Sequence, residues 1–278
     1  MGKVLDEISD KEARWIAESK VFFVATAPLS SEHHVSVSPK APGSSCVVLS
    51  GREVAYADLT GSGAETAAHV LQNGRMTLMF CNLERGPPQI LRLFGKAELI
   101  LAGHVPASLL TKFPNHVTSN DGFRAVYRLE VHRISTSCGY SLPQMDFVKY
   151  RATLDEWTEK AGKVGMSVYV TKKNSFSIDG LPSLALLRKR GPGHTIVPVV
   201  DKGYIYGKEV MDEDSSSSLS MALATNQALE VARKMHVRAN KHRTEGMKRV
   251  VVGVVVLVMT FAVGVFVGHY HAAVPIWV

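Results

Sequence analysis

Near the C-terminus of the chain lies a stretch of 18 uncharged residues, 250–267, which reads VVVGVVVLVMTFAVGVFV. A helix of that length spans roughly 27 Å, close to the thickness of the hydrocarbon core of a bilayer. A buried core helix is the alternative, but valine is a modest helix former and the stretch has no polar face. We therefore expect a single transmembrane anchor over residues 250–270 and a short tail over residues 271–278.

The basic residues of the chain gather immediately before this stretch. The formal net charge is +7 and the isoelectric point is about 9.3. Residues 233–249 contain seven basic residues and one acid, which gives +6, so that only +1 remains for residues 1–232. Basic residues beside a membrane span stay in the cytoplasm, which predicts a cytosolic N-terminal head and the layout of a tail-anchored protein. Contact with anionic lipid and a nucleic-acid patch are the two other interpretations of these residues.

We favour the interpretation that the basic residues set the orientation of the membrane span, and contact with anionic lipid is compatible with it. We expect no nucleic-acid partner, because such binding needs a basic structured face with aromatic or groove-reading elements. The absence of basic residues after residue 250 favours the endoplasmic reticulum over the outer mitochondrial membrane. The three cysteines form no C-x-x-C pair, which indicates a reducing compartment and predicts no metal site. Mean hydropathy of +0.05 excludes a protein with several membrane spans.

Residues 1–140 show the short alternating or continuous apolar patterns that are typical of β-strands. The predicted strands are residues 21–27, 34–40, 46–49, 54–59, 75–81, 90–101 and 125–134. Helices are few and short, and we expect them after the capping box Ser9 to Glu12, over residues 64–73 and over residues 106–112. Closure of such a sheet removes its exposed edges. The fold class is therefore mainly β (α+β), an antiparallel six- to seven-stranded β-barrel with short helices at its rim.

The pattern weakens after residue 140. Residues 141–211 are predicted to form an extension with a helix over residues 153–163 and strands over residues 195–200 and 204–210. Residues 212–249 begin as an acidic, serine-rich linker and continue as a basic helix that joins the head to the anchor.

Common catalytic motifs are missing, since the chain has no G-x-x-x-x-G-K-[ST], H-E-x-x-H or G-x-S-x-G sequence. What stands out is the turn Thr-Gly-Ser-Gly over residues 60–63, between a predicted strand and a predicted helix. Its hydroxyl groups can donate hydrogen bonds, and free N–H groups at the start of a helix favour an anion such as phosphate. The alternative is an ordinary strand-to-helix turn that is capped by threonine or serine.

Several segments together resemble a known family. HVSVSPK is followed by VAYADLTGSGAETAAHVLQNGR, MTLMF and ILRLFGKAEL, and then by CGYSLPQM and KKNSFSIDGLPSL. Over residues 10–185 this order is similar to the pyridoxamine 5'-phosphate oxidase-like, FMN-binding split-barrel family, in an uncharacterised branch with a C-terminal membrane anchor. The resemblance implies a homodimeric split barrel that binds FMN at the subunit interface, with residues 141–211 packed on the barrel.

The resemblance also implies cofactor-binding residues. Lys40 would be a cation for the phosphate group and Ser38 a neighbouring donor, while Thr60 and Ser62 would donate from the turn. The remaining candidates are Arg75 and Arg92 for further positive charge, and Gln89 facing the flavin ring. A solvated strand-end lysine at residue 40 and a helix-capping arginine at residue 75 are the alternatives.

Two departures from the family pattern limit the function. Residues 62–64 read Ser-Gly-Ala where the family has a serine followed by a basic residue, and the substrate-binding motif near the end of the oxidase is not recognisable. We expect a membrane-anchored flavin-binding protein, an oxidoreductase of unknown substrate that does not oxidise pyridoxamine phosphate itself. The alternatives are a non-catalytic dimeric interaction module at a membrane and, because of the histidines, a haem-handling split barrel.

Overall fold

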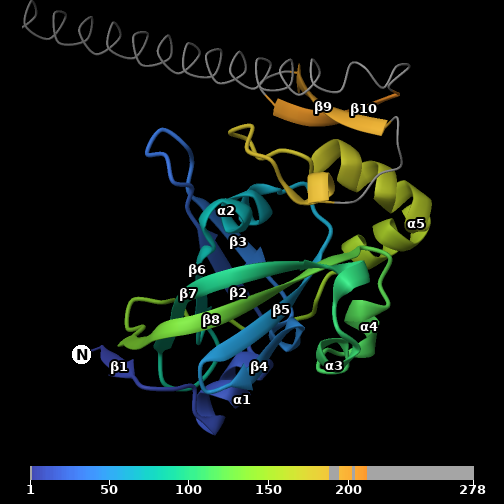
Figure 1. The fold of residues 1–278 in the computed structure, drawn as a ribbon. Helices are drawn as coiled ribbons and strands as arrows, with labels where there is room; N and C mark the ends of the chain where they lie inside the picture. The colour runs from blue at the N-terminus through green and yellow to red at the C-terminus, as the bar shows by residue number, and fades with distance from the viewer. Residues whose placement is uncertain (1, 188–193, 202–203, 212–278) are drawn as a thin grey trace, which may run out of the picture. The chain divides into compact units, whose positions relative to one another are not determined.

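A computed structural model describes residues 2–187, 194–201 and 204–211 of the chain (Figure 1). The predicted linker, anchor and tail over residues 212–278 lie outside the described residues. Within the described ranges, no helix is both long enough and apolar enough to span a membrane.

The described head is built on one antiparallel sheet, as predicted. Its strands follow the order β3-β2-β6-β7-β8-β5-β4, and the short strand β1 pairs with β8. Their bounds are β1 Lys3–Leu5, β2 Phe22–Thr26, β3 Ser36–Lys40, β4 Cys46–Ser50, β5 Glu53–Leu59, β6 Arg75–Cys81, β7 Gln89–Leu101 and β8 Phe123–Cys138. Burial alternates along β2 and β6, because successive side chains point to opposite faces of a sheet. This mainly antiparallel architecture with few helices is consistent with a split barrel.

Gly95 shows why β7 and β8 can run side by side for so long. The register between these two strands shifts at Gly95, where a β-bulge lies. A Cβ atom at this position would lie 2.0 Å from the backbone oxygen of Glu130, which is far inside contact distance. Only glycine therefore allows the two backbones to approach here.

Aromatic rings fill the interior of the sheet. Phe22 stacks on Phe80 with ring centroids 5.4 Å apart and meets Tyr56 edge-on at 5.8 Å. Tyr56 stacks in turn on Tyr127 at 4.9 Å. All four side chains are buried, and such pairs add stability beyond the area they bury.

Short helices cover the ends of the sheet. They are α1 Asp10–Glu18, η1 Gly43–Ser45, α2 Glu65–Asn73, η2 Ala102–His104, α3 Ala107–Leu110 and α4 Asn115–Thr118. Figure 1 shows α3 and α4 beside β5, where Leu109, Phe113 and Val117 form a buried apolar cluster with residues of β5 and β8. The Ser9 side chain accepts a hydrogen bond from the Lys11 N–H, as expected for an N-cap, and α2 ends at Asn73 as predicted, with Gly74 as its C-cap.

The extension differs from its predicted outline in one helix. α5 covers Thr153–Lys173 and continues ten residues beyond the predicted end, across a kink at Gly162 whose φ is 60°. Glycine tolerates this left-handed conformation, and the apolar residues Met166 and Val170 of the second half are buried. η3 (Leu184–Leu187) follows, and the two predicted strands, β9 (His194–Asp201) and β10 (Tyr204–Met211), pair with each other as an antiparallel hairpin.

Candidate functional site

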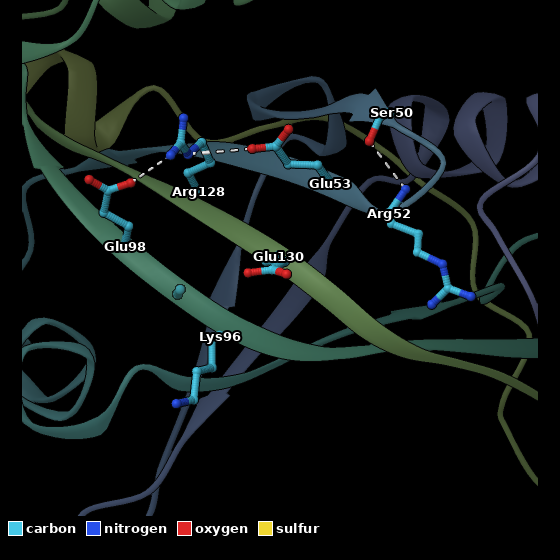
Figure 2. Close-up of a pocket in the computed structure, with 8 residues that line it drawn as sticks. Ser50, Arg52, Glu53, Lys96, Glu98, Arg128 and Glu130 are labelled. Carbon is cyan, nitrogen blue, oxygen red and sulfur yellow. Dashed lines mark hydrogen bonds and ion pairs between the residues drawn. The ribbon is translucent and has the colours of Figure 1, made fainter.

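A charged surface pocket of about 500 Å³ lies over β5, β7 and β8 (Figure 2). Three of its charged residues form ion pairs, since Arg128 contacts Glu98 at 2.9 Å and Glu53 at 3.4 Å. These side chains are well exposed, and exposed ion pairs of this kind contribute little stability. The pocket contains none of the predicted cofactor-binding residues.

A second pocket, of about 600 Å³, brings two of those predicted residues together. Ser38 of β3 and Ser62 of the turn over residues 60–63 both line it. The other walls come from α2, the end of α5 and β10. Its volume lies within the range of about 300 to 1,000 Å³ that is usual for small-molecule sites. We call it the Ser38–Ser62 pocket.

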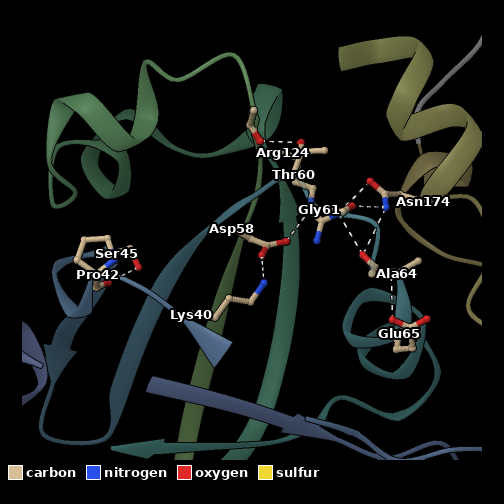
Figure 3. Close-up of polar contacts among 12 residues, drawn as sticks. Lys40, Pro42, Ser45, Asp58, Thr60, Gly61, Ala64, Glu65, Arg124 and Asn174 are labelled. Carbon is tan, nitrogen blue, oxygen red and sulfur yellow. Dashed lines mark hydrogen bonds and ion pairs between the residues drawn. The ribbon is translucent and has the colours of Figure 1, made fainter. Parts of the chain in front are cut away.

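Lys40 belongs to a buried ionic network behind this turn (Figure 3). Asp58 of β5 is almost fully buried and accepts a hydrogen bond from Lys40 Nζ at 2.6 Å and one from Arg124 Nε at 2.7 Å. Burial by itself would raise the pKa of Asp58, but the adjacent guanidinium and ammonium groups hold this pKa below its ordinary value. Two cations thus share one carboxylate, so the network has a net positive charge.

Arg124 also fixes the shape of the turn. Its Nη1 donates to the backbone oxygens of Gly61 and Gly63, each at 3.2 Å, and to Oδ1 of Asn174 at 2.9 Å. Asn174 Nδ2 donates to the same Gly61 oxygen at 2.9 Å. The C=O and N–H groups of a trans peptide unit point in opposite directions, so the Ser62 N–H points away from Arg124. No acceptor contacts that N–H within the described ranges.

The extension holds the loops on both sides of the pocket. Asp179, whose side chain is buried, accepts from the backbone N–H of His34 at 2.9 Å and contacts His34 Nδ1 at 2.7 Å. Ser183 Oγ donates to the Ala64 oxygen at 2.7 Å. Residues of the extension thus contact the turn and the β2–β3 loop through specific hydrogen bonds.

The other predicted residues lie outside the Ser38–Ser62 pocket. Thr60 is buried and its hydroxyl donates to the Gly122 oxygen at 2.7 Å, whereas Arg75 donates to the Pro28 oxygen at 2.9 Å and to the Asn73 side chain at 3.4 Å. Gln89 and Arg92 lie on β7, which β2 and β6 separate from β3. Arg92 donates there to Ser137 Oγ at 3.1 Å.

Arg124, Asn174 and Asp179 were not among the predicted site residues. Asn174 and Asp179 lie in KKNSFSIDGLPSL, one of the segments that carry the family resemblance. Arg124 has no comparable local signal, because a single arginine at the start of a strand is common on protein surfaces.

Comparisons with known proteins agree with this fold. Residues 8–138 match the family model described as "Pyridoxamine 5'-phosphate oxidase". The chain is 35% identical over 209 residues to the pyridoxamine 5'-phosphate oxidase family protein ustO of Aspergillus flavus, an alignment that covers 67% of this chain and 80% of that protein.

Two solved structures illustrate the structural neighbours. HupZ of Group A Streptococcus is 21% identical, and the match covers 46% of this chain and 91% of that chain with a TM-score of 0.36. A FAD-binding protein of Mesorhizobium loti is 16% identical, and the match covers 49% of this chain and 96% of that chain with a TM-score of 0.31.

Proposed function

Because this chain belongs to the pyridoxamine 5'-phosphate oxidase family, we propose that it binds FMN in the Ser38–Ser62 pocket and acts as an oxidoreductase at a membrane. One observation supports the proposal above the others. Arg124 and Asn174 hold the carbonyl groups of the turn on its inner side, and the Ser62 N–H is left without an acceptor in the described part of the chain. This arrangement suits an anionic group.

The residues of the pocket fit the phosphate group of FMN. The Ser38 and Ser62 hydroxyls and the Ser62 N–H would donate to it. The net positive charge of the Lys40–Asp58–Arg124 network favours an anion nearby. Bound flavin supplies the transfer of electrons or hydride, so the polypeptide has to bind and orient the cofactor. Oxidation of pyridoxamine phosphate itself is not part of the proposal.

The proposal includes a homodimer. Val35 and Val37, next to Ser36 and Ser38 on the pocket wall, are 68% and 62% exposed, and the segment after β8 exposes further large apolar side chains. These residues are Tyr140, Met145, Phe147, Val148 and Tyr150. A second subunit over these surfaces would remove apolar area from water.

We further propose that residues 250–270 anchor the protein in a membrane with the head in the cytosol, and that the basic residues before them contact anionic lipid. The endoplasmic reticulum is the favoured membrane. The support is the apolar stretch and the +6 charge of residues 233–249. Carbonate extraction and protease protection of the full chain in isolated membranes test the anchor and its orientation.

A non-catalytic dimeric interaction module is the second candidate. It is favoured because two residues predicted to bind the phosphate group instead donate hydrogen bonds to other groups of this chain. Lys40 donates to Asp58, and Thr60 donates to the Gly122 oxygen. This candidate predicts a split barrel that binds no flavin.

The cofactor content of the full-length chain distinguishes the two candidates. The protein, purified in a mild detergent, should show the visible absorption of a flavin and release FMN on denaturation, or take up added FMN. Replacement of both Ser38 and Ser62 by alanine should weaken FMN binding, whereas replacement of the exposed Ser108 on α3, which does not line the pocket, should not. A colourless protein that takes up no FMN would contradict flavin binding and support the interaction module.

A further inference from the structure

The described residues that line the Ser38–Ser62 pocket include two with a formal charge, Glu65 and Lys173. The Glu65 carboxylate accepts hydrogen bonds from the backbone N–H groups of Ala64 at 3.1 Å and Ile178 at 3.3 Å. Lys173 forms no ion pair with a carboxylate within the described ranges. Among the described lining residues, Lys173 is therefore the one cation, and no carboxylate forms an ion pair with it there.

The position of Lys173 is set by its neighbours. It is the last residue of α5, and the next residue, Asn174, is fully buried and bonded to the turn through Gly61. Its Nζ lies 3.9 Å from the ring centroid of Tyr206 on β10, and Tyr206 also lines the pocket. A cation–π contact of this kind restrains an otherwise flexible ammonium group beside the pocket.

The turn itself has no basic residue to bind a phosphate group. Residues 62–64 read Ser-Gly-Ala, and the predicted phosphate cation Lys40 is bonded to Asp58. A phosphate group carries up to two negative charges, and Glu65 on the same wall would repel it. A cation that lines the pocket is therefore needed to offset both.

We propose that Lys173 binds the phosphate group of the flavin in the Ser38–Ser62 pocket, so that the extension supplies the cation that the turn lacks. This inference rests on the proposed function, because it requires that the pocket binds FMN. It assigns to the end of α5 a role in ligand binding, in addition to its packing on β10.

The test compares FMN with riboflavin, which has the same ring system and no phosphate group. Affinities of the full-length chain for both are measured by quenching of flavin fluorescence. K173Q should weaken FMN binding about ten- to a hundredfold, the usual effect of losing a hydrogen bond to a charged group, and leave riboflavin binding unchanged. K172Q, which removes the same charge from the exposed neighbouring residue, should change neither affinity. K173R should retain most of the FMN affinity.

Each other outcome contradicts a specific claim. If K173Q binds FMN as tightly as the unmodified chain, or loses FMN and riboflavin equally, Lys173 does not bind the phosphate group, although flavin binding itself stands. If the unmodified chain binds neither compound, both this inference and the proposed function are wrong. Thermal unfolding of K173Q followed by circular dichroism shows whether its fold is intact, and the K173R result separates loss of charge from loss of packing.

Discussion

Replacement of Asp58 by asparagine should destabilise the head strongly. The carboxylate lies between Lys40 Nζ and Arg124 Nε at 2.6 and 2.7 Å, and the Arg124 side chain is only 8% exposed. Removal of one partner from a buried ion pair costs about 3–5 kcal/mol, because a charge stays buried without its counter-charge. Lys40 keeps 21% of its side-chain exposure and asparagine still offers one acceptor oxygen, so we expect a loss near the lower end, about 3 kcal/mol.

The measurement is urea unfolding of the full-length chain in a mild detergent, followed by far-ultraviolet circular dichroism. A loss of about 3 kcal/mol should lower the unfolding midpoint by roughly 1–2 M urea. E53Q is the matched control, because Glu53 pairs with Arg128 at 3.4 Å on the exposed surface and should contribute less than about 1 kcal/mol.

The pH dependence provides an independent check on Asp58. Its pKa is lower in the folded chain than its ordinary value of 3.8, so the ionised group stabilises the fold above that value. The contribution is lost as the pH falls from about 3.8 towards the folded-state pKa, and D58N should lack this part of the acid transition. A D58N chain that is as stable as E53Q, with an unchanged acid transition, would refute the role of the network.

Three further predictions concern single residues. Burial lowers the pKa of the fully buried His69, so its neutral form stabilises the fold above about pH 6.5, and this contribution is lost as the pH falls below that value. H69Q should therefore flatten this part of a curve of stability against pH, and an unchanged curve would contradict the lowered pKa. G95A should lose about 1–3 kcal/mol or more in urea unfolding because its Cβ meets a strand backbone, whereas G61A, whose Cβ meets open space, should lose much less; equal losses would contradict the close approach. Burial raises the pKa of Cys46 to about 12, so iodoacetamide should label the exposed Cys138 first in the native chain, and equal labelling rates in peptide mass spectra would show that Cys46 is accessible.

The strands of the head were predictable because their patterns are local. Alternating burial in β2 and β6 follows directly from alternating residue types, and the ends of α2 follow from its turn and Gly74. The prediction was less accurate for elements that are stabilised by contacts with residues distant in sequence. β1 has three residues and exists because β8 offers it an edge, and the second half of α5 is stabilised by tertiary burial beyond its kink.

In the candidate site too, features with a local sequence pattern were predicted and features that depend on distant contacts were not. Ser38 and Ser62 were predicted from a motif order, and the structure places both on one pocket. The engagement of Lys40 by Asp58 could not be predicted, because an isolated lysine at the end of β3 gives no sign of a partner 18 residues away in β5, a strand that does not pair with β3. The contribution of Arg124 and Asn174 depends on contacts that span 50 to 113 residues of sequence, and no local pattern encodes such contacts.

The bond between Asn174 and the turn has a consequence for synthesis. The ribosome makes Asn174 113 residues after Gly61, so the strands on either side of the turn are complete long before the amide that holds its carbonyl groups exists. A nascent chain that ends within α5 therefore contains every strand of the large sheet but lacks the amide that bonds to the turn. The hydrogen bond from Asn174 to the Gly61 oxygen should form late in translation, after the chain passes Asn174, rather than gradually as the sheet grows.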